Sequence, residues 1–220
     1  MTFSELQSAV LSGAFNETQR SSVKDWLNYA AGQLWNLESW TFRLAEDAVS
    51  VTTDSTAVTG LPTDLGIPTG LWNSDGDPLL YVTPTVWNSS YYGATGTGLP
   101  EVWTIVDGAI RVGPISNETA TDYRLAYERA FGHYQTGTTT FTAGNMSEDG
   151  DTPVFPTETH YTLVWWARML GKAARSDSTA QIDSQLRDEG IEFMRRNYLA
   201  GQRAGGEQWG AFDPDAYGAG

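Results

Sequence analysis

The sequence predicts an α+β fold, in which an α-helical bundle formed by N- and C-terminal helices carries a central antiparallel β insertion. Apolar residues recur at helical spacing over residues 3–37 and 158–199. Between these segments, short stretches of alternating apolar and polar residues are separated by Gly, Pro, Thr and Asn, which is typical of strands and turns. The expected division is residues 1–44 and 156–200 for the bundle, 45–155 for the β-rich insertion and 201–220 for a flexible C-terminal tail.

The N-terminal region predicts two helices. Thr2 and Glu5 have the spacing of a capping box, and Gly13 is a plausible end for this first helix. The second helix is expected from Asn16 to Leu37. One stripe of this helix is apolar and is expected to face the core; it contains Val23, Leu27, Ala30, Leu34 and Leu37.

The central region predicts short strands. The expected strands are residues 47–53, 56–59, 67–72, 78–82, 101–106, 109–112 and 121–129. Asp107-Gly108 between two apolar runs is the strongest short signal for a tight hairpin, because both central residues of that turn require positive φ. Pro114 is expected to end the second strand of this hairpin, since it has no N–H to donate. Residues 88–98 and 136–152 are expected to be loops.

The C-terminal region predicts two more helices. The first is expected from Glu158 to Ala174, and the second is capped by Asp177 or Ser178 and reaches Leu199. The last residues are a Gly/Ala-rich stretch with aromatic residues at intervals.

Composition limits the classes of protein to which the chain can belong. With 220 residues, 40% of them hydrophobic, and nine tryptophans, it can bury a substantial core. There is no cysteine, which excludes disulfides and thiolate metal sites. No stretch approaches the ~20 apolar residues of a membrane span, and the N-terminus lacks the features of a signal peptide. We therefore expect a soluble protein that is made in a cytosol and has no membrane contact.

The formal net charge of −14, from 27 acidic and 13 basic residues, argues against coating a phosphate backbone. An acidic surface would still let DNA slide past without specific binding. The alternative is that the acidity confers only solubility.

The search for chemistry finds no nucleophile elbow, phosphate-binding loop or HExxH zinc motif. His133 is expected in a loop and His160 in the first turn of a helix, so neither suggests a metal site. We predict no catalytic residue, no metal and no cofactor. A hydrolase that uses a carboxylate pair in the β region stays open as an alternative, since such a pairing is spatial.

Some helices carry apolar residues on a second face, which indicates either burial inside one bundle or contact with neighbouring subunits. We favour subunit contacts. The predicted interface residues are Tyr29, Trp35, Trp165, Met169, Met194 and Tyr198. In the tail, Trp209, Phe212 and Tyr217 are predicted anchors that dock onto a partner, and a plain disordered end is the alternative.

Several short motifs follow one another along residues 3–200. They are residues 23–28 (VKDWLN), 40–42 (WTF), 61–64 (LPTD), 98–101 (GLPE), 107–108 (DG) with Pro114, 125–127 (LAY) and 155–158 (FPTE). In this order they resemble the head-to-tail connector, or portal adaptor, proteins of tailed bacteriophages.

The resemblance implies a structural virion protein with no catalytic residues. Such proteins form a ring, usually of twelve subunits, that docks beneath the portal protein and extends its DNA channel toward the tail. The bundle would form the ring wall, the β insertion would face a downstream tail or head-closure protein, and the tail would reach the portal or a neighbouring subunit. The protein would be located in the neck of the virion after assembly in the host cytoplasm.

A carbohydrate-binding or receptor-binding module of a tail structure is the main alternative. In that case aromatic side chains of the β region would form a platform on which sugar rings stack. The candidates are Trp72, Trp87, Tyr91, Tyr92 and Trp103.

Overall fold

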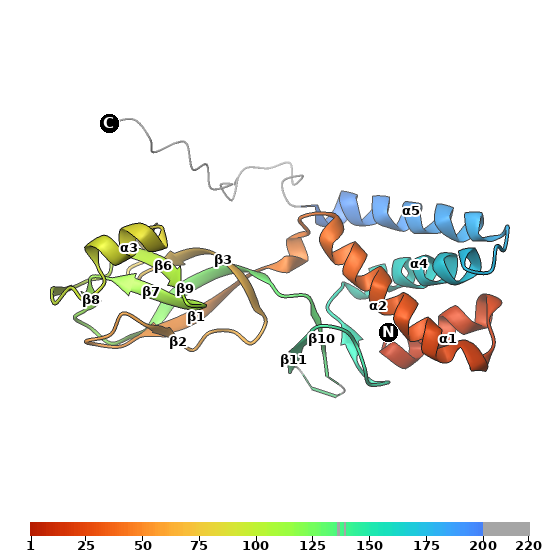
Figure 1. The fold of residues 1–220 in the computed structure, drawn as a ribbon, viewed down its shortest axis with the longest axis horizontal. Coiled ribbons are helices and arrows are strands. Elements are labelled where there is room, and N and C mark those ends of the chain that lie inside the picture. The colour runs from red at the N-terminus through yellow and green to blue at the C-terminus, as the bar shows by residue number, and fades with distance from the viewer. Residues whose placement is uncertain (136, 139, 200–220) are drawn as a thin grey trace.

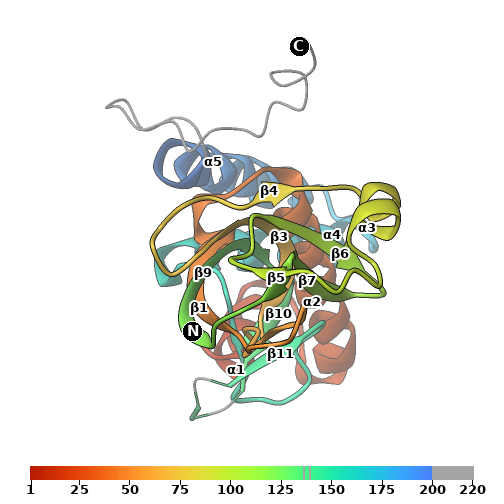
Figure 2. The same ribbon diagram turned by 90° about the vertical axis from the view of Figure 1, so that its left-hand side faces the viewer.

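The computed structural model describes residues 1–135, 137–138 and 140–199. The molecule is elongated, with a helical part at one end and a β part at the other (Figure 1). Each part is built around its own hydrophobic core. The helical part consists of α1 (Phe3–Ala14), α2 (Arg20–Leu37), α4 (His160–Ala173) and α5 (Ala180–Tyr198). The short helix α3 (Pro84–Ser90) lies on the β part, as both ribbon views show (Figures 1 and 2).

The helices begin where the local sequence satisfies their free N–H groups. The Thr2 hydroxyl accepts a hydrogen bond from the Glu5 N–H, and the Glu5 carboxylate accepts one from the Thr2 N–H. This is the capping box that the sequence predicts. The second predicted helix begins with a 3-10 turn at Glu17–Gln19 and continues as α2. A further 3-10 turn, Thr157–Thr159, leads into α4.

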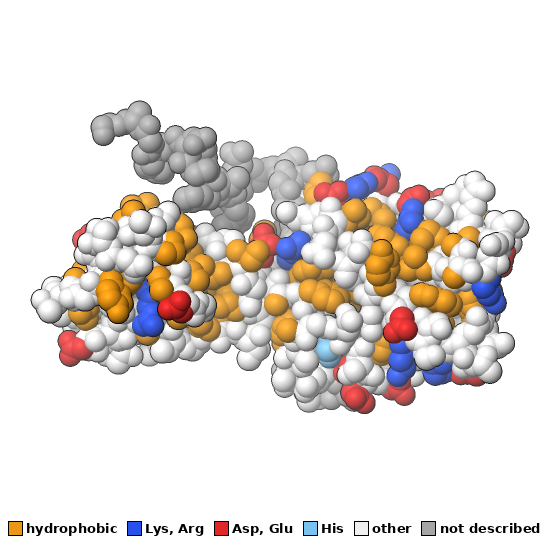
Figure 3. Space-filling view, viewed as in Figure 1, with side chains coloured by type: hydrophobic (Ala, Val, Ile, Leu, Met, Phe, Trp, Pro, Cys, Tyr) orange, Lys and Arg blue, Asp and Glu red, His pale blue; other side chains and the backbone are white. Residues whose placement is uncertain are grey.

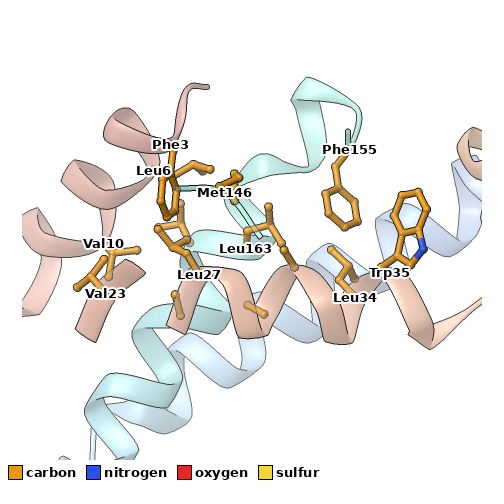
Figure 4. Packing of buried hydrophobic residues seen from close by; sticks show 14 of the residues in the cluster. Phe3, Leu6, Val10, Val23, Leu27, Leu34, Trp35, Met146, Phe155 and Leu163 are labelled. Atoms are coloured by element: carbon orange, nitrogen blue, oxygen red, sulfur yellow. The ribbon is translucent and has the colours of Figure 1, made fainter. Parts of the chain in front are cut away.

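Helix α4 lies at the centre of the helical part, where α1, α2 and α5 all pack against it. Close approach depends on two glycines. A Cβ atom on Gly171 would lie 2.3 Å from the Trp26 ring, and one on Gly190 would lie 2.4 Å from the Thr162 hydroxyl oxygen. Figure 4 shows the side chains of this core, with Phe3 and Leu6 of α1 facing Leu27 of α2.

The strands form four separate sheets. The largest is antiparallel, in the order β2 (Val58–Thr59), β1 (Leu44–Val51), β9 (Ala120–Arg129), β3 (Leu65–Trp72). The second contains β4 (Leu80–Tyr81), β6 (Val102–Val106) and β7 (Ala109–Gly113), and the third pairs β5 (Thr97–Gly98) with β8 (Ile115–Ser116). The fourth contains β10 (Gly132–Tyr134), β11 (Phe141–Ala143) and β12 (Thr152–Pro153).

The predicted hairpin is confirmed. Strands β6 and β7 are antiparallel with Val106 opposite Ala109, and the two turn residues have positive φ, 52° at Asp107 and 73° at Gly108. This backbone twist matches that of the flanking strands, which is why Asp-Gly is favoured in such turns.

The two larger sheets are joined along both sides and enclose one core. Backbone bridges link Ala57 to Arg111 on one side and Trp72 to Pro78 on the other. Side chains from both sheets fill the space between them, including Val49 of β1, Val112 of β7 and Leu125 of β9. The β part therefore has its own apolar interior, which is independent of the helices.

The predicted architecture, a helical bundle with one central antiparallel insertion, is wrong, although the α+β class holds. The central region contains helix α3, and its strands fall into four sheets, in which β4–β6 and β5–β8 are parallel pairs. Helices are thus distributed among many strands. The physical reason is that strands of two or three residues carry no periodic signal, so pairing between distant segments decides where they form.

Specific loop predictions also fail. Residues 88–98 include the end of α3, and residues 136–152 include β11. Helix α3 begins with a signal that was available, since the Thr83 hydroxyl accepts the Val86 N–H and Pro84 occupies the first turn. The predicted division at residues 44/45 and 155/156 stays a prediction, and we note that Met146 and Phe155 lie in the helical core.

A compact cluster joins the two parts. The Arg43 guanidinium donates to the backbone oxygens of Trp35 and Glu38, and pairs with the Glu128 carboxylate of β9 at 2.6 Å. It also lies 5.2 Å from the centre of the Trp35 ring. Because Trp35 and Glu38 are at the end of α2, this one side chain ties the last turn of α2 to the largest sheet.

We predict opposite effects for two helical glycines. Gly171→Ala lowers the free energy of unfolding by about 1–2 kcal/mol, because the added methyl group overpacks the core against Trp26. In contrast, Gly32→Ala raises it by up to about 1 kcal/mol, because open space surrounds that position and Ala favours helix. Urea unfolding of both variants measures the difference, and equal effects would contradict the packing described.

We also predict that two buried tyrosines of β9 differ. The Tyr127 hydroxyl donates to Asp64 at 2.8 Å, whereas the Tyr123 hydroxyl has no hydrogen-bond partner within the described residues. Tyr127→Phe therefore costs about 1 kcal/mol or more of stability, and Tyr123→Phe costs nothing or stabilises.

The stability at alkaline pH provides a second test of the burial of Tyr123. Burial, with nearby Glu118 and Asp122, raises the pKa of Tyr123 to about 12 from 10.0. The neutral phenol therefore contributes stability that is complete below pH 10 and is lost as the pH rises toward 12. Tyr123→Phe should reduce the loss of unfolding free energy between pH 10 and pH 12. An unchanged loss would contradict this prediction.

Candidate subunit interface

Helix α4 keeps two stripes of apolar side chains at the surface although three helices pack against it. At 3.6 residues per turn, Tyr161 and Trp165 lie about 140° around the helix axis from Trp166 and Leu170. Helix α5 packs between these stripes, where Gly190 meets Thr162 and Arg187 meets Met169. The stripes are therefore on different faces of the helical layer.

The first stripe forms what we call the aromatic ridge, consisting of Tyr161 and Trp165. Their ring centres are 6.1 Å apart, and Tyr161 is 55% exposed. Arg168 and Lys172 continue the same stripe at i+7 and i+11. Both pair with the buried carboxylate of Asp183 on α5, at 3.4 Å and 2.7 Å. The ridge is thus bordered by two cations that share one anion.

The second stripe forms the floor of what we call the apolar groove, between α2 and α5. Its volume is about 430 Å³, and its apolar lining residues are Leu37, Trp166 and Ile191. Charged residues of α5 also line it: Arg187, Asp188, Glu192 and Arg195. The Arg187 guanidinium lies over the Trp166 ring, 5.3 Å from its centre. Arg195 pairs with Glu38 at 2.8 Å and with Glu192 at 2.7 Å, so here two anions share one cation.

Hydrophobic side chains are widespread on the surface of the helical part. Figure 3 shows them across the middle of this part, with charged side chains mainly along its upper and lower borders. Patches of this kind on a surface indicate contact with another protein.

Two of the predicted interface residues lie at the surface of the helical part. Tyr29 is 56% exposed on α2. Trp165 is half-buried in the aromatic ridge.

Two other predicted interface residues lie in the core of a single chain. Trp35 packs against the rings of Phe42, Phe131 and Phe155, with centres about 6 Å apart. Met194 is fully buried among the helices. Their burial leaves them no surface to offer a neighbouring subunit, since the chain itself already covers these second faces.

Met169 and Tyr198 are half-buried and already have partners. An Arg187 nitrogen lies 3.0 Å from the Met169 sulfur. The Tyr198 ring packs edge-on against Phe42, and its hydroxyl donates a hydrogen bond to the Glu158 carboxylate. This bond raises the pKa of Tyr198 to about 12 and lowers the pKa of Glu158. The predicted anchors Trp209, Phe212 and Tyr217 lie outside the described residues.

Sequence reasoning missed part of both surfaces. Tyr161 precedes Trp165 by four residues, a spacing that places both side chains on one face, so this signal was available. The groove was not predictable in the same way. Leu37, Trp166 and Ile191 come from three helices, and the predicted core stripes had included Leu37.

The aromatic residues of the β part do not form an open platform. Trp87 and Trp103 are buried, and Tyr91 stacks on Trp87 with ring centres 5.4 Å apart. Arg124 covers the Trp72 ring at 4.5 Å. Of the five candidates, Tyr92 is the one that is largely exposed, at 79%. The geometry therefore gives no support to the sugar-stacking alternative.

The two histidines have structural contacts. His133 lies in β10 and not in the predicted loop, and its Nε2 is 3.3 Å from the buried Asp151 carboxylate. His160 begins α4, as predicted; its Nε2 bonds the Phe155 carbonyl oxygen, and burial lowers its pKa. Across residues 1–135, 137–138 and 140–199, no three His, Asp or Glu side chains are placed to hold a metal ion. In the same residues, no helix is long and apolar enough to cross a membrane.

A comparison with models of protein families gives a match. The family model described as SU10 adaptor protein matches residues 1–210, nearly the whole chain. A search among curated proteins finds no match.

We predict that the buried and exposed members of the predicted interface respond differently to truncation. Met194→Ala lowers the free energy of unfolding by about 2–4 kcal/mol, because it leaves a cavity in the helical core. Tyr29→Ala changes it by about 0.5 kcal/mol or less, because the side chain is exposed. Thermal unfolding of the two variants decides this, and a large loss for Tyr29→Ala would contradict its exposure.

Proposed function

Because this chain belongs to the SU10 adaptor protein family, we propose that its copies form a ring beneath the portal of a tailed bacteriophage and extend the DNA channel toward the tail. The head-to-tail adaptor resemblance read from the sequence is confirmed by this membership. The role is that of a structural adaptor of a phage. Ring formation, channel and subunit number are the parts that we propose.

The observation that supports a ring is the pair of open apolar surfaces on α4. A helix that exposes apolar side chains on two faces can contact one neighbour on each side. Repetition of such a contact by rotation produces a closed ring. For the number of subunits, the sequence resemblance suggests twelve.

The distribution of charge supports passage of DNA without specific binding. Residues 45–155 contain 14 acidic and three basic residues, and so carry most of the net charge of −14. The acidic surface of the β part repels phosphates, so DNA would pass it without adhering.

The remaining parts of the proposal concern partners and place. The ring would bind the portal on one side and a downstream tail or head-closure protein on the other. It would be found in the neck of the virion after assembly in the host cytoplasm, and would act without catalysis during genome ejection.

Electron microscopy of the purified chain mixed with portal rings of its own phage tests the proposal. We expect rings coaxial with the portal. A chain that stays monomeric and unbound in the presence of portal rings would contradict it.

We predict that the C-terminal tail contributes to docking. Deletion of residues 201–220 should weaken binding to portal rings and leave the thermal unfolding of the remainder unchanged. The triple variant Trp209→Ala/Phe212→Ala/Tyr217→Ala should reproduce the loss, whereas Gln202→Ala/Gln208→Ala should not, because aromatic anchors supply most binding energy at such contacts. Full binding by the deletion would show that the tail is not an anchor.

A further inference from the structure

The aromatic ridge projects from the helical part, and the apolar groove is a hollow in it. The ridge presents two neighbouring aromatic rings, one of them more than half exposed. The groove is a hollow of about 430 Å³ lined by three apolar side chains, with the Arg187 guanidinium over the Trp166 ring. Pockets of this size hold small aromatic ligands, so the groove has room for an aromatic side chain.

The charges that border the two surfaces are complementary as well. Beside the ridge, the half-buried Arg168 and the buried Lys172 share the buried Asp183, and this trio carries one net positive charge, which reaches the surface at Arg168. At the rim of the groove, Glu38 and Glu192 share Arg195, and this trio carries one net negative charge. When the ridge of one copy approaches the groove of another, unlike charges come together, which favours this pairing over ridge against ridge or groove against groove.

The placement of the two surfaces determines the kind of assembly. They lie on different faces of α4, about 140° apart around its axis. A symmetric dimer uses the same patch twice and would leave the other surface open in both copies. A head-to-tail contact uses both surfaces in every copy, and a ring leaves none of them exposed.

We propose that the aromatic ridge of one subunit, Tyr161 and Trp165, inserts into the apolar groove of the next subunit, between Leu37 and Ile191 and against the Arg187 side chain that lies over Trp166. This contact rests on the ring proposed above and names the partner of each surface as a second copy of this chain. Trp165 is the central anchor, and the charged trios set the direction around the ring.

Cross-linking tests the contact directly, since the chain has no cysteine of its own. Tyr161→Cys places a thiol on the ridge, and Leu37→Cys places one in the groove. The two full-length variants are mixed, assembled on portal rings and treated with a short bis-maleimide. We expect covalent dimers in the mixture and none with either variant alone. The double variant should give a ladder of higher oligomers, because every contact then carries both thiols.

A matched control uses Ser89→Cys, which places an exposed thiol on α3 of the β part. Mixed with Tyr161→Cys, it should give no dimers. In addition, Trp165→Ala should abolish the cross-link between Tyr161→Cys and Leu37→Cys, while the chain still unfolds cooperatively at a somewhat lower temperature because Trp165 is half-buried. Trp165→Phe should retain the cross-link.

The possible results distinguish a failure of the proposed contact from a failure of the proposed function. Dimers from a single variant would indicate a symmetric contact and overturn the inference. Rings seen on the portal by electron microscopy without the mixed cross-link would also overturn it, while the proposed function would stand. If no rings form, both proposals fail.

Discussion

The contacts of Arg43 join the end of α2 to the largest sheet and so connect the two halves of the molecule. The last carbonyl groups of a helix have no partner within the helix, and they form the negative end of its dipole. A guanidinium that donates to the Trp35 and Glu38 carbonyls satisfies two of them with a charge of the favourable sign. Its ion pair with Glu128 then connects the end of α2 to β9, the strand that β1 and β3 flank. The two parts are therefore connected by a cluster of specific contacts and not only by the polypeptide chain.

The aromatic residues near Arg43 explain why a second apolar face on a helix does not by itself indicate a contact between subunits. Trp35 and Tyr198 lie off the main stripes of their helices, yet Phe42 contacts both. The segment that leaves α2 and the segment that enters α4 fold back over these faces. A layer of few helices can thus cover part of its own apolar surface with connecting segments, and the surface that remains open is smaller than the sequence suggests.

The surface that does remain open is organised around α4. Three helices pack against it, two of them at glycines that permit close approach, and the angular space left between them falls into two stripes. The charges of the chain are distributed unequally between the helical part and the β part. The helical segments 1–44 and 156–199 contain nearly equal numbers of acidic and basic residues, whereas 45–155 is strongly acidic. Identical copies can therefore approach through their helical parts with little repulsion, while their β parts repel one another and partners with phosphate groups.

The sequence by itself determined the features that depend on neighbouring residues. The capping box at Thr2, the extent of the long helices and the hairpin at Asp107-Gly108 follow from local hydrogen bonds and backbone dihedral angles, so a short stretch suffices to predict them. The tertiary structure alone decided how the strands divide into sheets, because a strand of two residues such as β4 or β8 exists only through its distant partner. It also decided which apolar side chains stay open. Periodicity places Met194 and Trp165 alike off the core stripe, but burial depends on which segment of the chain packs over them.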